Sequence, residues 1–535
     1  MSQNPIFRRR ARFLAALVGL IAALSRPVPA GANPRPAFVL HFNFLSSAAE
    51  ERHLIDVAQK AGATALVVVP PSHVWEDPPS LAVLDDIFAE AERRGLQIAI
   101  SRIDACQITP LRDYRPDFLF AKILTEPGRL PNGQPSASFF LSTVGRPDYD
   151  RWMEEETRFY AKRYGRRPCL IGFTMGALSE TIVSQRGGLL QYMTETESYE
   201  FTQYTPAMKE RWAAWLARRF GTIETLNGDY ATRFAVFDDV PMPKNDSDER
   251  FGRADRAYFD FAACINDWVE ERYHRCRAIW HDNGAPANVP FLIHFSGFDA
   301  EKFALGHPGL AALDLPGWIA DADGVGLSLY TNGGYPDFGH GSVRAMVGLL
   351  GLARELGKPA LVLEGGCEDP TPVIKESELT FFATAALPLA PLIVAYEFLH
   401  DPYGGAPEDD SARLVDGAGH VRRRAALAVS KALALSARGA TPAEEPALTC
   451  AFDPASARNH PRIALVYKDL YALAGVLPVR WIPARREDTR ARAAAAWRPT
   501  GEDPLSKLII EWRDAAPARQ AQLLAEIRAA GKKIN

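Results

Sequence analysis

Short apolar segments alternate with longer amphipathic segments from residue 37 to about residue 402. The short segments are apolar along their whole length, which is typical of strands buried on both faces of a parallel sheet. The longer segments have apolar residues at helical spacing. We predict strands over Phe38–Phe44, Ala65–Val69, Gln97–Ile103, Cys169–Met175, Phe291–Phe295, Val325–Tyr330, Ala360–Leu363 and Leu392–Tyr396. We predict helices over Ala48–Ala61, Leu81–Arg94, Met208–Phe220, 254–281, Val343–Leu356 and 375–387.

Eight alternating units predict an α/β fold, a closed (β/α)8 TIM barrel within residues 33–438. A doubly wound open sheet is the alternative, but no G-x-G-x-x-G motif follows the first strand. Two connections, 108–168 and 181–288, are long and follow the C-terminal end of a strand, where barrel enzymes build their sites. The first is rich in proline, glycine and serine, so we expect a loop across the rim.

A second, smaller unit follows the barrel. A polar loop and a helix over His420–Leu435 lead to a linker at Pro442–Pro446. Beyond the linker we predict a small α/β segment over residues 447–535. Its apolar runs predict three strands and one helix, over 461–467, 477–482, 507–511 and Ala516–Ala530.

Residues 1–32 have the pattern of a secretory signal peptide. A basic stretch at Arg8–Arg12 precedes an apolar run over Phe13–Leu24, and Ala30-Gly31-Ala32 forms an A-x-A cleavage site. The apolar run is too short to span a bilayer comfortably, which takes about 20 residues. We expect cleavage near Asn33 and a periplasmic or secreted protein without stable membrane insertion. An uncleaved anchor is the alternative, and both Sec and twin-arginine export fit the arginines.

Composition and charge exclude several classes of protein. The 535 residues are 47% hydrophobic and carry 61 basic and 65 acidic side chains, a net charge of −4. This mildly acidic balance argues against nucleic acid as a partner. Six cysteines are too few for a disulfide scaffold. Cys264 and Cys276 lie on one predicted helix, about 18 Å apart, so they cannot pair. No cysteine or histidine spacing resembles a metal site, and we expect neither a metal nor a cofactor.

Three carboxylates follow predicted strands and therefore lie at the mouth of the barrel. Glu364 ends the seventh strand, Glu180 lies just beyond the fourth, and Asp104 ends the third. An ionised carboxylate directly after an apolar strand is costly unless it has a partner or a task. Two carboxylates across a barrel mouth are what retaining glycoside hydrolysis requires. We predict that Glu364 and Glu180 are catalytic; salt bridges or solvated loop positions are the structural alternatives.

Other polar and aromatic residues follow the predicted strands and could contact a sugar. Aromatic rings suit the C–H faces of sugars, although rim packing explains them equally well. The structural alternative for the histidine is a satisfied core position. No G-x-S-x-G elbow supports a serine nucleophile. With Asp104, the predicted substrate-binding residues are Asn43, Trp75, His294, Tyr330 and Asn332.

One helical segment carries a motif of a known family. The segment Trp212-Ala-Ala-Trp-Leu-Ala-Arg-Arg-Phe-Gly-Thr-Ile-Glu-Thr-Leu-Asn227 resembles a WL-x-x-(K/R)-(Y/F)-G-T-(L/I)-x-x-LN stretch of glycoside hydrolase family 42. Further similar stretches occur in the same order along residues 38–531. They are Arg94-Gly-Leu-Gln-Ile98, the helix from Tyr258 to Trp280, Lys358-Pro-Ala-Leu-Val-Leu-Glu364, Leu414-Val-Asp-Gly-Ala-Gly-His-Val-Arg422 and Arg462-Ile-Ala-Leu-Val-Tyr467.

The resemblance implies a clan A barrel that hydrolyses a β-linked sugar, often a galactoside, with retention. Glu364 takes the position of the nucleophile. Residues 447–535 would be a truncated amidotransferase-like second domain, through which family members often form trimers. Two departures stand out. Family members carry Asn-Glu after the fourth strand, where this chain has Ala177-Leu178 and then Glu180, and an arginine of the second strand is replaced by Val68.

Three functions fit these observations. The first is an exported glycoside hydrolase acting on an oligo- or polysaccharide. The second is a carbohydrate-binding pseudoenzyme that serves polysaccharide assembly or export. The third is a polysaccharide lyase or transglycosylase on the same barrel. A second carboxylate facing Glu364 separates the enzyme from the pseudoenzyme.

The A-x-A site gives a direct prediction about export. We expect the exported chain to begin near Asn33, because signal peptidase cuts after small residues. Intact-mass spectrometry of the exported protein measures this. A mass that retains Met1 would contradict the prediction.

Overall fold

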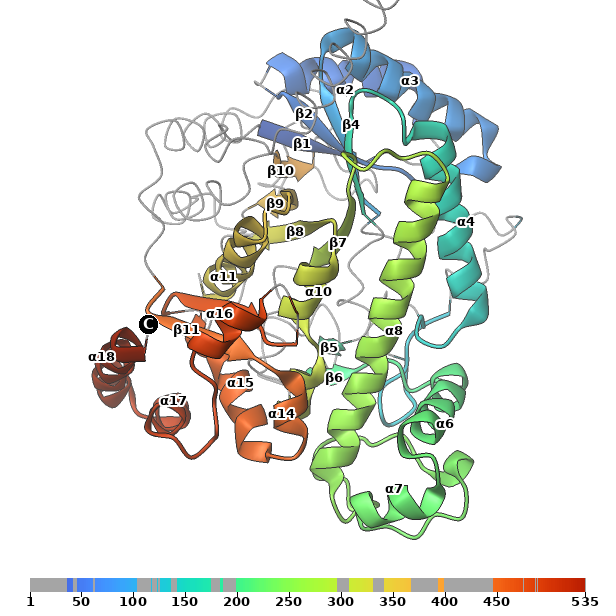
Figure 1. The fold of residues 1–535 in the computed structure, drawn as a ribbon. Coiled ribbons are helices and arrows are strands. Elements are labelled where there is room, and N and C mark those ends of the chain that lie inside the picture. Colours follow the sequence, from blue (N-terminus) through green and yellow to red (C-terminus); the bar gives the residue numbers. More distant parts are fainter. Residues whose placement is uncertain are drawn as a thin grey trace, which may run out of the picture.

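The computed structural model describes residues 36–41, 46–60, 63–102, 117, 123, 126–135, 142–174, 183–185, 199–295, 307–330, 341–366, 393–398, 446–474, 476–485, 487 and 489–534. Parallel strands form one closed barrel in the order β1-β10-β9-β8-β7-β4-β3-β2 (Figure 1). This sheet confirms the predicted barrel over the open alternative. The strands are β1 Pro36–His41, β2 Ala65–Val69, β3 Gln97–Ile100, β4 Leu170–Thr174, β7 Phe291–Phe295, β8 Gly324–Tyr330, β9 Ala360–Gly366 and β10 Ile393–Phe398.

Helices follow the strands and cover the outside of the barrel. Local signals set their ends: Asp77 caps α3 by accepting from the Ser80 backbone N–H at 3.1 Å, and Gly95 ends it at φ 68°. The predicted helix over 375–387 lies outside the described residues, as does His420–Leu435. The described helices on the outside of the barrel include α2 Ala48–Lys60, α3 Pro78–Arg94, α4 Pro147–Tyr164, α8 Ala254–Asp282, α10 Leu315–Asp321 and α11 Gly341–Glu355.

The two long connections contain more regular structure than expected. Helix α4 occupies part of the first, so the prediction of a loop throughout 108–168 was wrong. Its buried residues Tyr149, Trp152 and Tyr160 recur at helical spacing, a pattern obscured by the proline-rich stretch before it. The second connection holds the antiparallel pair β5 Val183–Gln185 and β6 Tyr199–Phe201, then α6 Pro206–Phe220 and α7 Ile223–Tyr230.

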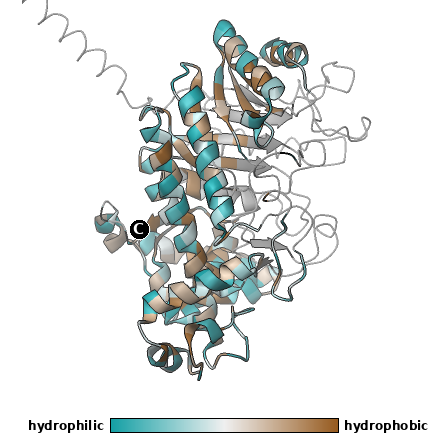
Figure 2. Cartoon of the chain, turned by 90° about the vertical axis from the view of Figure 1, so that its right-hand side faces the viewer, coloured by the Kyte–Doolittle hydropathy of each residue, from teal (hydrophilic) through white to brown (hydrophobic). Residues whose placement is uncertain are grey.

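Strand residues alternate between two cores. Leu66 and Val68 point outward and pack with the helices, whereas Val67 points into the barrel. The inner core contains only strand residues. Glycine at position 326 leaves room for the Leu363 side chain, because a Cβ there would lie 2.5 Å from Leu363 Cδ1. The barrel is therefore packed in its lower layers, as (β/α)8 barrels are. Figure 2 shows the strand arrowheads pointing to one side, with hydrophilic residues on the outer faces of the helices.

The C-terminal unit differs from its prediction. Residues 461–467 and 507–511 are helical, so two of the three predicted strands were wrong. Pro504 stands in the first turn and Asp503 accepts from the Ser506 backbone N–H, a helix-start signal that outweighs the short apolar run. The strand near 477–482 and the last helix are confirmed. The unit comprises β11 Leu448–Phe452, α14 Pro454–Arg458, α15 Pro461–Ala474, β12 Val479–Pro483, α16 Arg490–Ala495, α17 Pro504–Asp514 and α18 Pro517–Ile534.

This unit packs against the barrel through several elements, and two of the contacts show how close the packing is. Gly348 of α11 lies against β12, where a Cβ would come within 2.8 Å of the Val479 carbonyl oxygen. Arg458 of α14 donates to Asp260 of α8 at 2.5 Å and to Asp229 of α7 at 2.5 Å. Asp260 is fully buried, and Arg458 and Arg219 together compensate its charge. The two units therefore form one packed body (Figure 1).

His294 is a buried histidine on the inner face of the barrel. It lies two residues beyond Leu292 on β7, so its side chain faces inward. Only 2% of it is exposed, and burial lowers the pKa of its imidazole to about 3. The ring is therefore neutral at ordinary pH.

This burial predicts how acid affects stability. The unfolded chain binds a proton at His294 below pH 6.5, whereas the folded chain does so only near pH 3, so stability falls as the pH drops through this window. We expect wild type to lose about 1.4 kcal/mol more per pH unit than His294→Gln. Urea unfolding at several pH values measures the difference, with the exposed His53→Gln as control. Parallel pH profiles for wild type and His294→Gln would contradict the assignment.

Candidate active site

The carboxyl ends of the barrel strands meet at one rim, and this rim is where the sequence predicts the site. Glu364 lies on β9, near its end, and its backbone pairs with Ser328 of β8. The ladder between these strands shifts at this point: Leu327 pairs with Val362, but Ser328 pairs with Glu364 and not with Leu363. Such a shift is a β-bulge, which often re-aims residues beside active sites.

The shift changes which residue of β9 lies opposite Ser328. Leu363 belongs to the inner core, so in an uninterrupted ladder its successor would take an outward position. A Cβ on Gly326 would contact Leu363 and Thr174, so Gly326 is at an inward position of β8. Ser328 comes two residues later and therefore has the same inward register. Glu364 therefore occupies the register position beside Ser328 that Leu363 would otherwise hold.

Arg102 lies two residues beyond the end of β3 and is fully buried at the same rim. Its Nε donates to Glu156 of α4 at 2.9 Å, and its other nitrogens donate to the Pro70 carbonyl and, at 3.2 Å, to Ser72 Oγ. Burial raises the pKa of Glu156, and the positive charge of Arg102 opposes that rise. The pair thus ties the loop after β2 to the end of β3 and to α4.

The backbone beyond β3 is also tied to the next strand of the barrel. The N–H of Arg102 donates to Oγ1 of Thr174, the last residue of β4, at 3.4 Å. A buried arginine and a strand-end hydroxyl therefore fix the relative heights of three neighbouring strand ends. This fixed rim is the platform on which a barrel site is built.

Trp75 and His73 lie in the loop after β2. His73 has a left-handed backbone at φ 60°, which is uncommon outside glycine and is concentrated at functional sites. Burial, followed by the charge of Arg102, lowers the pKa of His73 to about 3. The Trp75 ring is half-buried, 5.2 Å from the His73 ring and 5.6 Å from that of Phe159. Trp75 thus packs at the rim with part of its ring exposed.

The two long connections brace each other over the rim. Gln203 Oε1 accepts from the backbone N–H groups of Thr143 at 2.9 Å and Val144 at 3.1 Å. Gln203 is fully buried, so these bonds satisfy a side-chain oxygen that would be costly to leave alone. The Tyr204 backbone N–H donates to the Arg129 carbonyl at 3.0 Å. The connections after β3 and β4 are therefore joined.

The predicted site residues divide into three groups. The side chains of Trp75 and His294 are described, the first at the rim and the second inside the barrel. Glu364 and Tyr330 are placed by their backbone at the ends of β9 and β8. The remaining four lie outside the described residues, and they are Asn43, Asp104, Glu180 and Asn332.

Sequence reasoning missed three residues of this rim. Arg102 could have been noticed, because a charged residue just after a buried apolar strand signals a partner. His73 and Gln203 carry no such signal in the sequence. The role of His73 depends on its backbone angle, and that of Gln203 on hydrogen bonds to a distant loop. Each of the three acts on the shape of the rim through hydrogen bonds or backbone conformation.

Within the described residues we find no candidate metal cluster, no pairing among the four described cysteines and no membrane-spanning helix. No group of three or more His, Cys, Asp or Glu side chains within them could hold an ion. Cys169, Cys264, Cys276 and Cys450 are buried and unpaired with one another, which confirms that Cys264 and Cys276 do not pair. No helix in the described part of the chain is both long and apolar enough to cross a bilayer.

Comparisons with known proteins identify the fold and the family. Residues 76–305 match the profile of glycoside hydrolase family 42, described as "Beta-galactosidase". Similar solved structures include the β-galactosidase of the Antarctic haloarchaeon Halorubrum lacusprofundi, with a TM-score of 0.60 and 16% identity over 85% of this chain and 67% of that one. The β-galactosidase of Bacillus circulans sp. alkalophilus has a TM-score of 0.59 and 15% identity over 86% and 66%.

A cold-adapted β-galactosidase from a Rahnella species is similar as well, with a TM-score of 0.58 and 14% identity over 84% of this chain and 65% of that chain. The chain thus spans about two thirds of the length of these relatives. The comparison with curated proteins gives no match. The structural likeness establishes the shared fold, and the profile match confirms the resemblance of the helical motif. Residues 76–305 of this chain therefore match a domain of glycoside hydrolase family 42, a family of retaining glycoside hydrolases.

Proposed function

We propose that this chain is an exported glycoside hydrolase that cleaves a β-linked sugar in an oligo- or polysaccharide with retention. Glu364 is the nucleophile and Glu180 the acid/base. The observation that carries the proposal is the register shift on β9, which gives Glu364 the position beside Ser328 at the rim. We infer that this bulge directs the carboxylate of Glu364 to the mouth of the barrel, since bulges often re-aim residues beside active sites.

The chemistry follows from the two carboxylates. Glu364 attacks the anomeric carbon as Glu180 donates its proton to the leaving oxygen, and the glycosidic bond breaks. Glu180 then takes a proton from water, which attacks the same carbon and releases Glu364. Two inversions give net retention, and the carboxyl groups should lie about 5–5.5 Å apart.

The order of strands supports this pairing. β4 and β9 are separated by β7 and β8 around the closed barrel, so residues beyond their ends face each other across the mouth. Glu180 follows the end of β4, whose last residue, Thr174, is held by Arg102. We propose that Asp104, Asn43, Tyr330 and Asn332 bind sugar hydroxyls around this pair.

Trp75 and His294 have surroundings that refine their proposed roles. The exposed part of the Trp75 ring suits stacking against a sugar, while its other contacts hold it in place. His294 is neutral, so it can donate one hydrogen bond without adding a positive charge beside Glu364. A nearby cation would hold both carboxyl groups ionised, but the acid/base must start protonated.

The substrate to test first is a β-galactoside, since the three similar structures named above are β-galactosidases. The proposed organisation is a signal peptide at 1–32, a catalytic barrel at 33–438 and an amidotransferase-like unit at 447–535. The parallel β11–β12 pair with α15 between its strands supports the last assignment.

A carbohydrate-binding pseudoenzyme is the second candidate. It is favoured by one observation: Ala177-Leu178 stands where family members carry Asn-Glu. Such a protein would still bind carbohydrate at the rim but would not hydrolyse it. The two predictions below separate it from the enzyme.

The first prediction concerns the nucleophile. Glu364→Gln should lower kcat on an aryl β-glycoside by on the order of 10⁴-fold, because the amide cannot form the glycosyl–enzyme ester. The change is nearly isosteric, so the melting temperature should stay within a few degrees of wild type. Glu502→Gln, at an exposed position of the C-terminal unit, is the control and should keep full activity. Equal turnover by Glu364→Gln and wild type would overturn the assignment.

The second prediction concerns the acid/base. Glu180→Gln should slow hydrolysis of a disaccharide far more than that of an aryl glycoside, since a good leaving group needs little protonation. Steady-state rates on both substrates measure this. If both fall equally or neither falls, Glu180 is not the acid, and Glu195, Glu197 or Glu397 takes its place in the same test.

A further inference from the structure

A hollow of about 1090 Å³ lies between the C-terminal unit and barrel helix α11, away from the rim. It is bounded by β11 and β12, by the end of α11 and by α16 and α18. Gly531 positions α18 here, because a Cβ at this residue would clash with the Ala447 carbonyl oxygen at the start of β11. The groove is therefore built by close backbone packing.

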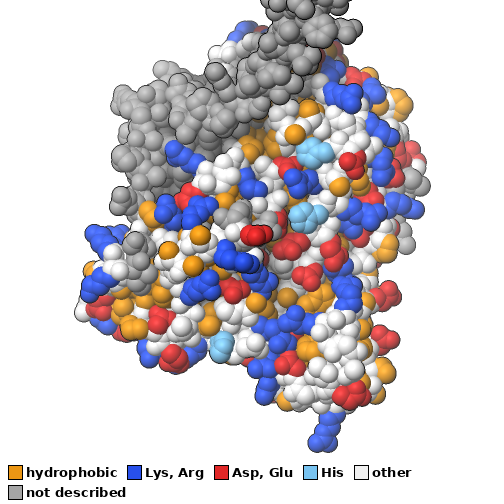
Figure 3. Space-filling model, viewed as in Figure 1, with side chains coloured by type: hydrophobic (Ala, Val, Ile, Leu, Met, Phe, Trp, Pro, Cys, Tyr) orange, Lys and Arg blue, Asp and Glu red, His pale blue; other side chains and the backbone are white. Residues whose placement is uncertain are grey.

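Basic side chains dominate the groove. Arg480, Arg492, Arg528 and Lys532 line it, against a single acid, Glu355. Figure 3 shows acidic and basic side chains mixed over one face of the molecule, so a concentration of one sign is a local feature. A hollow lined by one sign of charge focuses its field and attracts counter-ions.

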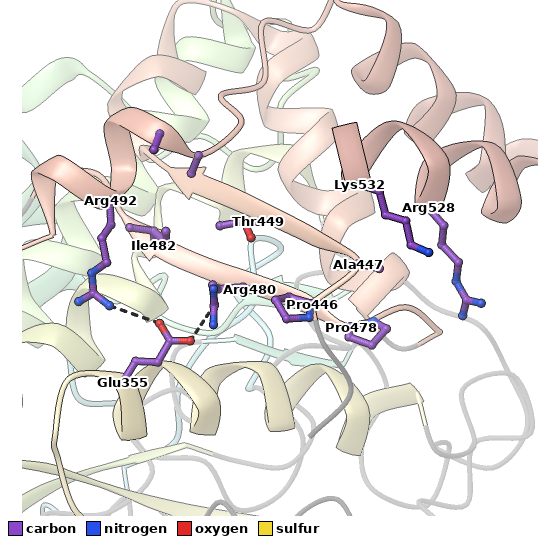
Figure 4. Close-up of a pocket in the computed structure, with 12 residues that line it drawn as sticks. Glu355, Pro446, Ala447, Thr449, Pro478, Arg480, Ile482, Arg492, Arg528 and Lys532 are labelled. Carbon is purple, nitrogen blue, oxygen red and sulfur yellow. Dashed lines mark hydrogen bonds and ion pairs between the residues drawn. The ribbon is translucent and has the colours of Figure 1, made fainter. Parts of the chain in front are cut away.

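The charges fall into two groups at opposite ends of the groove (Figure 4). At one end Arg480 and Arg492 hold Glu355, at 2.7 Å and 3.4 Å. At the other end Arg528 and Lys532 project from α18, and no ion pair or hydrogen bond joins them to the rest of the described chain. Exposed ion pairs contribute little to stability, so Arg480 and Arg492 can exchange Glu355 for an anion. Arg528 and Lys532 can bind an anion directly.

The lining also indicates what kind of anion fits. Among the described residues no aromatic ring lines the groove. Recognition by stacking, which single-stranded nucleic acids and neutral sugars exploit, is therefore missing. Arginine forks match carboxylates in two-pronged hydrogen bonds. Arg528 and Lys532 lie one helical turn apart, about 6 Å along the axis, a spacing similar to that of adjacent sugars in an extended chain.

We propose that this groove binds a carboxylate-bearing polysaccharide. The inference deepens the proposed function, since it names an acidic glycan as the class of substrate. Arg528 and Lys532 bind successive carboxylates, and Arg480 and Arg492 bind another where they flank Glu355.

The test measures binding separately from hydrolysis. The mature full-length protein is titrated with a long galacturonate oligomer, a neutral galactan oligomer and inorganic polyphosphate by calorimetry. The Arg528→Glu/Lys532→Glu variant should bind galacturonate about tenfold more weakly or worse, because two charge-assisted contacts become repulsive. The matched control is Lys162→Glu/Arg218→Glu, which changes the same charge at exposed positions on α4 and α6.

We expect wild type and control to bind galacturonate alike, and to bind galactan weakly. Both variants should hydrolyse a small aryl glycoside at the wild-type rate, since the groove lies away from the rim. The inference is overturned if galactan binds as tightly as galacturonate, if polyphosphate binds more tightly, or if the groove variant binds like the control. Absent turnover with intact galacturonate binding would instead count against the proposed hydrolase.

Discussion

Parallel pairing between the first and last barrel strands is the constraint on which the rest of the structure depends. Pro36 and Ala37 of β1 pair with Val394 and Ala395 of β10, although most of the chain separates them. Closing the sheet removes its edges and brings every strand's carboxyl end to one rim. Residues as distant in sequence as Trp75 and Glu364 thereby reach the same mouth.

Within the closed ring, a local departure from regular pairing lies at the proposed site. The ladder between β8 and β9 slips by one residue at Glu364, which an unbroken alternation after Leu363 would place in an outward position. Nearby, Arg102 and Glu156 form a buried ion pair that holds the ends of β2 and β3 against α4. A buried pair of this kind adds little net stability, but removing one partner is costly, so it fixes geometry more than it strengthens the fold.

The fold was largely predictable because its strands are buried on both faces and therefore read as continuous apolar runs, as Val67–Val69 do. The C-terminal unit was less predictable. The short run at 507–511 fits either a strand or one face of a helix, and only the cap at Asp503 distinguishes them. Strand β11 was missed because an alternating Leu448–Phe452 stretch lies beside a linker.

The candidate site was predictable in part. Acids that follow strands can be found from sequence, since the barrel sends strand ends to one rim. The register shift at Glu364 cannot be found from the sequence, because it depends on how β9 pairs with β8. The basic groove is equally hidden: Glu355, Arg480 and Arg528 are scattered along the chain and meet only when α11, β12 and α18 pack.

The central claim is that Glu364 forms the covalent bond to the sugar. A 2-deoxy-2-fluoro β-galactoside with a good leaving group slows release of the glycosyl–enzyme more than its formation, so the intermediate accumulates. Peptide mass spectrometry of the trapped protein should place the sugar on Glu364. A label on any other carboxylate, or continued hydrolysis with no labelled peptide, would contradict the account.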